Sequence, residues 1–189
     1  MSEIVPGTIT SMDYTIFQLI NGLSGKNIYH DAFSVFLAEH LIYIMAFVTL
    51  CLVIHWRKYW ARAILGTGIA YGVNLIIGHI YFRPRPFVFH NVVQLISKSS
   101  AEKSFPSGHA TAAFALAFSV YFINKKWGVV LLIMALLVSF GRILVGVHYP
   151  LDVLGGAFLG LVFSYLAKLV DEKLWRSEHL NDNNSVTPE

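Results

Sequence analysis

Residues 127–147 have the sequence WGVVLLIMALLVSFGRILVGV, in which Arg142 is the one charged side chain. A helix of about 20 mainly apolar residues is long enough to cross the hydrocarbon core of a bilayer. This stretch therefore predicts a membrane-spanning helix that carries an arginine close to one end.

Four other apolar stretches follow the same pattern, and composition supports a membrane protein. The chain has 189 residues, of which 56% are hydrophobic and 13% charged, and its mean hydropathy is +0.59. These values are too apolar for an ordinary soluble domain. The sequence predicts an all-α integral membrane helical bundle with five transmembrane helices, at residues 33–54, 63–82, 107–124, 127–147 and 150–170.

Two glycine motifs predict close packing between helices. Gly68-x-x-x-Gly72 lies in the second span, together with the polar Asn74, and Gly156-x-x-x-Gly160 lies in the fifth. Small residues at this spacing let two helix backbones approach each other in a membrane.

The ends of the chain differ from the apolar middle. Ile16, Leu19, Ile20 and Leu23 fall at helical spacing, which favours an amphipathic helix lying on the membrane, with a short sixth span as the alternative. We therefore expect one domain: an N-terminal interfacial segment at 1–32, a transmembrane domain at 33–171 and a polar C-terminal tail at 172–189.

Charge and cysteine content exclude several classes of protein. The net charge is +3, but the basic residues lie in short loops and not in one stripe, so we expect no nucleic-acid partner. The lone Cys51 lies in an apolar run, which excludes a disulfide framework and a thiolate metal site. No group of His or carboxylate residues has metal-ligand spacing, so neither a metal nor another cofactor is expected.

Five spans place the loop at 83–106 and the turn at 147–150 on the same face of the membrane. Eight of the 14 Lys and Arg residues lie on the opposite face. They are Arg57, Lys58, Arg62, Lys125, Lys126, Lys168, Lys173 and Arg176. Because cytoplasmic loops carry an excess of Lys and Arg, the loop at 83–106 is expected outside the cytoplasm.

Two arginines on that face are candidates for binding phosphate. Arg142 is costly in a bilayer and needs an anionic partner or a wet cavity. The guanidinium fork binds phosphate oxygens in pairs, which suits both Arg85 and Arg142. For Arg142, a structural salt bridge to Glu39 or Asp152 is the alternative.

The start of the third span offers a backbone site for an anion. Ser107 follows Pro106 and precedes an Ala-rich segment, so it is placed as a helix N-cap. The free N–H groups of Ser107, Gly108 and His109 can then point together at an anion. An ordinary helix cap is the alternative.

Two histidines and an aspartate complete the candidate catalytic group. Pro150 suits the first turn of a helix, which places His148 just before that helix and Asp152 one turn along it. A carboxylate on one ring nitrogen leaves the other nitrogen free to attack phosphorus. His109, on another helix, could then protonate the leaving oxygen. Any one of these histidines could instead be structural.

These residues together resemble a known family. Arg85-Pro86, Pro106-Ser107-Gly108-His109 and Arg142-x5-His148-x3-Asp152 are similar, in order, to the three-part signature of the type-2 phosphatidic acid phosphatase superfamily. The resemblance implies metal-independent phosphoester or diphosphate hydrolysis through a phosphohistidine. It assigns His148 as nucleophile, Asp152 as its partner and His109 as general acid, with phosphate held by Arg85, Ser107, Gly108 and Arg142.

Two positions depart from that signature. The usual lysine seven residues before the first arginine is replaced by Gly78, and the serine before the third-motif arginine is replaced by Gly141. We hypothesise that Arg83 or His79 supplies the missing cation. An interfacial anchor for Arg83 and a packed helix-end histidine for His79 are the alternatives.

The missing lysine and a pattern outside the motifs narrow the resemblance. The run from Asp13 to Gly25, DYTIFQLINGLSG, together with Glu39 and Phe87, resembles the bacitracin-resistance branch of bacterial undecaprenyl-diphosphate phosphatases. The resemblance implies hydrolysis of undecaprenyl diphosphate at the outer face of the bacterial plasma membrane. The expected partners are a lipid-linked phosphate or diphosphate and membrane lipids, and a homo-oligomer is left open.

Three alternatives to this function remain. The first is a phosphatidylglycerophosphate or phosphatidic acid phosphatase. The second is a lipid phosphotransferase that passes the phosphoryl group to another lipid. The third is a membrane scaffold or transporter without catalysis.

Overall fold

The computed structural model describes residues 8–55 and 60–184, and every regular element in this part of the chain is helical. The helices are α1 (Thr8–Asn21), α2 (Ile28–Val35), the π-helical turn η1 (Phe36–His40), α3 (Leu41–His55), α4 (Trp60–Ile80), α5 (Pro86–Phe89), α6 (Gly108–Tyr121), α7 (Lys125–Leu144) and α8 (Pro150–Asn184). The predicted all-α class is confirmed.

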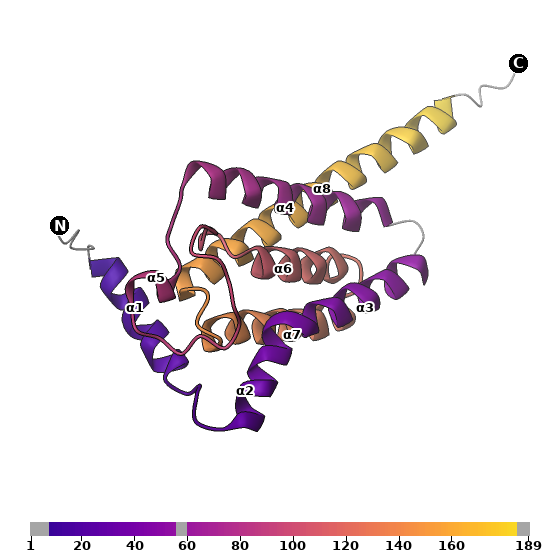
Figure 1. Ribbon diagram of the computed structural model, residues 1–189. Coiled ribbons are helices and arrows are strands. Elements are labelled where there is room, and N and C mark those ends of the chain that lie inside the picture. Colours follow the sequence, from indigo (N-terminus) through magenta and orange to yellow (C-terminus); the bar gives the residue numbers. More distant parts are fainter. Residues whose placement is uncertain (1–7, 56–59, 185–189) are drawn as a thin grey trace, which may run out of the picture.

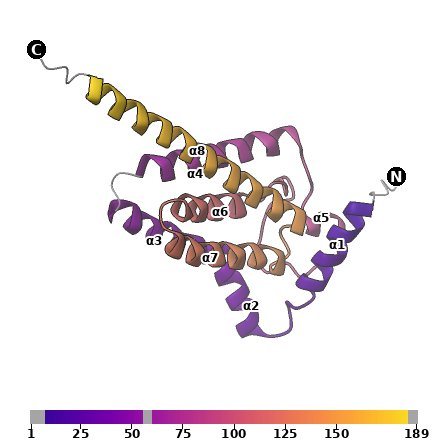
Figure 2. The same cartoon turned by 180° about the vertical axis from the view of Figure 1, so that it is seen from behind.

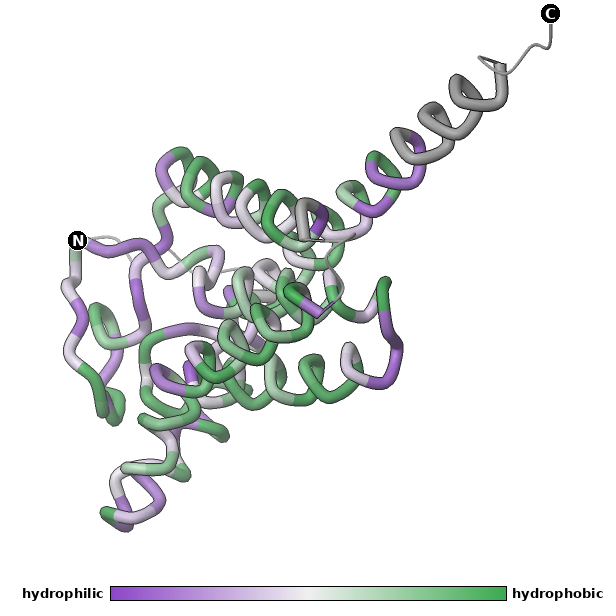
Figure 3. Tube along the Cα trace, turned by 90° about the vertical axis from the view of Figure 1, so that its right-hand side faces the viewer, coloured by the Kyte–Doolittle hydropathy of each residue, from purple (hydrophilic) through white to green (hydrophobic). Residues whose placement is uncertain are grey.

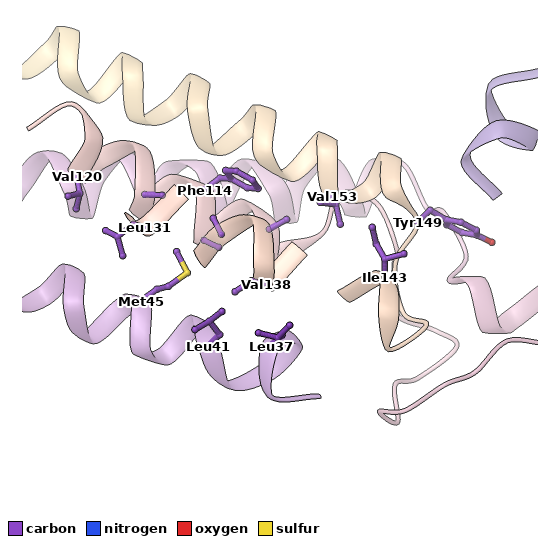
Figure 4. Packing of buried hydrophobic residues seen from close by; sticks show 14 of the residues in the cluster. Leu37, Leu41, Met45, Phe114, Val120, Leu131, Val138, Ile143, Tyr149 and Val153 are labelled. Atoms are coloured by element: carbon purple, nitrogen blue, oxygen red, sulfur yellow. The ribbon is translucent and has the colours of Figure 1, made fainter. Parts of the chain in front are cut away.

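Helix α6 forms the centre of the bundle. It lies between α4 and α8 on one side and α3 and α7 on the other (Figures 1 and 2). Its alanines permit this position, since Ala110, Ala113, Ala115 and Ala117 are completely buried. Around it, a core of larger side chains joins α3, α6, α7 and α8, among them Met45, Phe114, Leu131, Val138 and Val153 (Figure 4).

Only one of the two glycine motifs packs against another described helix. A Cβ at Gly160 would lie 2.7 Å from the backbone N of Ala115, and one at Gly156 would lie 2.8 Å from the carbonyl O of Ser107. The fifth predicted span therefore packs through its glycines against α6, as expected. The prediction for Gly68 and Gly72 was wrong, because no atom outside their own helix lies within 4 Å of a Cβ at either position. These glycines occupy a face of α4 that meets no other described helix.

Large apolar side chains also cover the outside of the bundle. Phe47, Ile64, Leu136 and Phe158, on four different helices, are between 59% and 66% exposed. Hydrophobic residues continue along the helices, whereas hydrophilic residues gather mainly in the loops and helix ends (Figure 3). Many large apolar side chains exposed in this way indicate a contact with membrane or partner, and here they lie on helices that are long enough to span.

Four segments of the described chain are long and apolar enough to cross a membrane. They are Ile28–Leu52, Arg62–Ile80, Lys125–Leu144 and Pro150–Lys173. These correspond to the first, second, fourth and fifth predicted spans. The third, α6, has 14 residues, or a length of about 21 Å against a hydrocarbon core of about 30 Å.

Helix α2 meets α3 at an angle, and η1 lies at the bend (Figure 1). A π-helical turn widens a helix locally and often occurs at functional sites. Here it brings the backbone of η1 against α7, since a Cβ at Gly141 would lie only 2.8 Å from the N of Ala38. This contact explains why glycine replaces the serine that the family signature has at position 141.

Helix α1 lies across the end of the bundle where α7 ends and α8 begins (Figures 1 and 2). Phe17 and Asp13 are buried against this end, while Ile16 and Leu19 are 44% and 70% exposed. Leu23, just after the helix, is 50% exposed. The helix therefore turns polar and aromatic groups toward the protein and aliphatic groups outward.

Candidate active site

The residues of the three motifs meet at one end of the bundle, around a cavity of roughly 310 Å³. The end of α4, the loop at 81–107, the start of α6, the end of α7 and the turn before α8 all contribute. The lining residues are Tyr71, Asn74, Leu75, Arg85, Lys98, Glu102, Lys103, Pro106, Gly108, His109, Arg142 and His148.

Local sequence explains how α6 and α8 present their ends to this cavity. Ser107 is the N-cap of α6, and its side chain accepts a hydrogen bond from the N–H of Ala110. Pro150 is the first residue of α8. Both helix starts are therefore where the sequence predicted them, and the N–H of Ser107 donates to the carbonyl of Asp152 at 2.9 Å, which ties the two starts together.

His148 lies in the turn between α7 and α8 and is almost fully buried. Its Nδ1 is 3.6 Å from Oδ2 of Asp152, which is too long for a hydrogen bond and becomes an ionic contact only when the imidazole is protonated. Burial lowers the pKa of His148 to about 4, although the Asp152 carboxylate acts in the opposite direction. The imidazole is therefore neutral near pH 7 and has the protonation state that a nucleophile requires.

Asp152 is completely buried. It makes closer contacts with three other groups than with His148. Its Oδ1 accepts from Arg83 at 2.6 Å. Its Oδ2 accepts from the Ser104 hydroxyl and, at 2.8 Å, from the N–H of Tyr149. These bonds hold the carboxylate rigidly behind the imidazole. The sequence did not indicate a role for Ser104.

Arg83 lies behind Asp152 and does not line the cavity. Its guanidinium also donates to Asp13 of α1 at 2.6 Å and stacks on the Tyr149 ring, with Cζ 4.1 Å from the ring centroid. Asp13 in turn accepts from the N–H of Leu151 at 2.9 Å. The structure therefore connects α1 to the candidate catalytic aspartate, and this geometry favours a positioning role for Arg83 over the phosphate contact that we hypothesised.

Arg85 and Arg142 both line the cavity and are nearly buried. Arg85 donates to the carbonyl of Val147 at 3.1 Å and to the Glu102 carboxylate at 3.0 Å. Arg142 donates to the carbonyl of Ala38 at 3.4 Å. Both guanidinium groups are thus held from behind by backbone oxygen atoms while they face the cavity.

Glu39 of η1 contacts two cations at the side of this cavity. It is 3.9 Å from Arg142 and 3.5 Å from Lys98. The salt bridge between Arg142 and Glu39 that we considered as an alternative is therefore present. It is long, and Glu39 is about one-third exposed, so it does not prevent Arg142 from also binding an anion.

The second hypothetical cation, His79, lies on an exposed face of α4 and does not line the cavity. A different cation does. Lys103 reaches into the cavity from the loop, as do Lys98 and Glu102. The three sequence motifs include neither of these lysines nor Glu102. Asn74, a polar residue in an apolar helix, was the available signal.

The cavity thus joins a buried neutral histidine, a second histidine at a helix start, two arginines and the first residue of α6, Gly108. Such an arrangement can bind a phosphate and transfer its phosphoryl group to an imidazole. Among the residues that the structure describes, no three His, Cys, Asp or Glu side chains lie close enough to hold a metal ion.

Comparison with protein families agrees with this chemistry. The model of the PAP2 superfamily matches residues 59–176, which include all three motifs. The chain belongs to the PAP2 superfamily. This membership confirms the resemblance inferred from the motifs, and with it a phosphatase that acts on membrane lipids.

Comparison with individual proteins extends this result. The chain is 39% identical to the undecaprenyl-diphosphatase BcrC of Bacillus subtilis over 159 residues, which cover 82% of each protein. It is 27% identical to YbjG of Escherichia coli over 86% of this chain and 84% of that protein. The crystal structure of LpxE from Aquifex aeolicus superposes with a TM-score of 0.73 at 26% identity, covering 82% of this chain and 94% of that one.

Proposed function

We propose that this PAP2 member hydrolyses undecaprenyl diphosphate to undecaprenyl phosphate through a phosphohistidine at His148. The observation that carries the proposal is the single cavity into which His148, His109, Arg85 and Arg142 converge. The 39% identity to BcrC, over most of both chains, supports the choice of substrate. The product would be the monophosphate lipid carrier used in cell-wall synthesis.

In the first step, the ring nitrogen of His148 opposite Asp152 attacks the terminal phosphorus. The bond between that phosphorus and the bridging oxygen breaks, and His109 donates a proton to the departing lipid monophosphate. Asp152 stabilises the imidazole as it becomes positively charged. Arg85 and Arg142 stabilise the charge that develops on the phosphoryl oxygens, together with the N–H groups of Gly108 and His109 at the start of α6; the N–H of Ser107 is already bonded to the carbonyl of Asp152.

In the second step, water attacks the phosphorus of the phosphohistidine. His109, now neutral, accepts a proton from the water. The bond between phosphorus and nitrogen breaks, orthophosphate leaves, and His148 regains its neutral form. His109 thus serves as acid in the first step and as base in the second, which restores the proton that it gave up.

We also propose the membrane arrangement. Helix α6 would be the fifth crossing, shorter than the others because it lies inside the ring that they form. The excess of Lys and Arg at the opposite end supports a cavity on the extracytoplasmic face of a bacterial plasma membrane. The outward aliphatic residues of α1 support an interfacial helix over a short sixth span.

The proposed division of the chain remains 1–32, 33–171 and 172–189. Helix α8 continues without a break to Asn184, so the boundary at 172 marks a change from apolar to polar composition within one helix.

A substrate panel tests the proposed activity. Phosphate release would be measured with undecaprenyl diphosphate, farnesyl diphosphate, phosphatidylglycerophosphate and phosphatidic acid, using purified protein and the His148→Ala variant. We expect release from the polyprenyl diphosphates and its loss, by at least about 10³-fold, in the variant with folding intact. Preference for a phosphatidyl lipid would favour the alternative function, a phosphatidylglycerophosphate or phosphatidic acid phosphatase. Persistent turnover by His148→Ala would refute the phosphohistidine.

Cysteine labelling tests the proposed side of the membrane. In a Cys51→Ser background, Ser100→Cys and Lys126→Cys would place single thiols at opposite ends of the bundle, at exposed positions. A membrane-impermeant maleimide should label only position 100 in intact cells. Labelling of position 126 instead would reverse the orientation.

A further inference from the structure

Lys103 crosses the face of α4 to reach the cavity. Its ammonium donates to the backbone carbonyl of Asn74 at 2.7 Å and to the side-chain Oδ1 of the same residue at 2.6 Å. Both acceptors are neutral. In contrast to Arg85 and Arg142, which have Glu102 and Glu39 nearby, Lys103 has no anionic partner in the part of the chain that the structure describes.

Gly78 creates the space through which Lys103 passes. A Cβ placed at Gly78 would overlap Cδ, Cε and Nζ of Lys103. In a helix, the side chain of residue i+4 covers the carbonyl of residue i. Glycine at 78 therefore leaves the carbonyl of Asn74 open, and Lys103 occupies the volume that a side chain at 78 would fill.

Asn74 fixes the ammonium beside the start of α6. Its side-chain amide donates to the carbonyl of Pro106 at 3.2 Å and to the hydroxyl of Thr111 at 2.8 Å. Asn74 is completely buried, so its orientation is set by these bonds. The same side chain therefore links Lys103 to the turn at Pro106 and to the first turn of α6.

Lys103 and Arg85 line the same cavity. Burial lowers the pKa of Lys103, and the nearby positive charge of Arg85 lowers it further. An anion bound between the two would remove this repulsion.

We propose that Lys103 binds the phosphate of the substrate beside Arg85, and that Gly78 exists to admit it. The loop would thus supply the cation that the family signature places at position 78 of the helix. The inference rests on the proposed phosphatase function and names a further substrate-binding residue for it.

The direct test is Lys103→Met, which keeps the length of the stem and removes the charge. We expect KM for undecaprenyl diphosphate to rise about 10-fold to 100-fold, as for the loss of one charge-assisted hydrogen bond. Gly78→Ala should have a similar effect, because the added Cβ displaces only the flexible end of Lys103 and not backbone. Lys26→Met, which removes an exposed charge outside the cavity, serves as the matched control and should leave KM unchanged.

A relocation variant separates charge from structural support. Lys103→Ala together with Gly78→Lys returns an ammonium to the same space from the helix. The double variant should reverse at least about half of the increase in log KM that removal of the Lys103 charge causes. Such a recovery would support phosphate binding. If Lys103→Met leaves KM unchanged, or if Gly78→Lys gives no recovery in a folded double variant, the inference is wrong.

Anion binding provides a readout that is independent of the lipid. Orthovanadate or inorganic phosphate should raise the unfolding temperature of the wild-type protein. Lys103→Met should need at least about a 10-fold higher anion concentration for the same rise. If Lys103→Met loses the anion stabilisation but the wild-type protein does not hydrolyse polyprenyl diphosphates, the proposed substrate is wrong and the role of Lys103 in anion binding stands. If the wild-type protein hydrolyses them but Lys103→Met keeps its full anion stabilisation, the proposed function stands and the role of Lys103 is wrong.

Discussion

The guanidinium of Arg83 donates to the carboxylate of Asp152 at 2.6 Å and holds it behind His148. The same guanidinium bonds Asp13 of α1, so the candidate catalytic aspartate is supported from a segment far away in the sequence. Because Asp152 is completely buried, its charge depends on this pairing.

Arg83→Met should therefore reduce kcat more than it changes KM. Removing one partner of a buried ion pair leaves an uncompensated charge and costs about 3 kcal/mol or more of unfolding free energy. Steady-state kinetics and thermal unfolding in detergent measure the two effects. Arg83→Lys should recover part of both. A large rise in KM at constant kcat would instead support a direct contact between Arg83 and the substrate phosphate.

The pH dependence of kcat/KM should have an acid limb well below the ordinary histidine range. Burial lowers the pKa of His148 to about 4 from a usual 6.5. Neutral His148 is the nucleophile, so activity should be retained as the pH falls through 6.5 and lost only as it approaches 4. The alkaline limb would report loss of the acidic proton, and both limbs describe the histidine pair and not one residue.

The pH profile of the Asp152→Asn variant tests whether His148 sets the acid limb. The carboxylate opposes the effect of burial on His148, so its removal should move the acid limb to still lower pH, in a much slower enzyme. An acid limb at 6.5 or above in the wild-type protein would contradict the buried, neutral nucleophile.

Glu102→Gln should strengthen binding of substrate. Glu102 occupies one side of the Arg85 guanidinium at 3.0 Å and is about half exposed, so it competes with phosphate and repels it. We expect KM to fall about 2-fold to 5-fold, the size of a partly exposed ion pair. Inhibition by orthophosphate should strengthen in parallel. A rise in KM would show that Glu102 helps to orient Arg85.

Hydrolysis should persist in excess chelator. Arginine and lysine side chains line the cavity and can balance the charge of a phosphate without a metal. The described residues offer no cluster of three metal-binding side chains. Phosphate release would be measured with and without EDTA. Activity lost in EDTA and restored by magnesium would contradict the proposed mechanism.

Two glycine substitutions should have opposite effects on stability. Gly160→Ala places a Cβ 2.7 Å from the α6 backbone, where neither helix can yield cheaply, and should cost about 1–3 kcal/mol. Gly68→Ala meets nothing within 4 Å and should be neutral or stabilising by up to about 1 kcal/mol, because alanine favours a helix. Unfolding midpoints of the two variants, measured under one condition, decide the comparison.

Much of this protein could be predicted without coordinates. Apolar runs of sufficient length specify helices because a backbone in lipid must satisfy its own hydrogen bonds. Ser107 and Pro150 mark helix starts through their local chemistry. The order of the three motifs then identified the residues that would converge, and the cavity contains five of the seven principal ones, Arg85, Gly108, His109, Arg142 and His148.

Other features depend on which helix faces meet, and local sequence does not contain that information. Gly68 and Gly160 belong to identical motifs, but only the second faces α6. Arg83 and Lys103 are both loop cations, but one pairs with Asp152 and the other passes over Gly78 to Asn74. The sequence alone determined the helices and the chemical groups of the site. The tertiary structure decided which loop cation reaches the cavity, because a long flexible side chain goes where neighbouring helices leave space and partners.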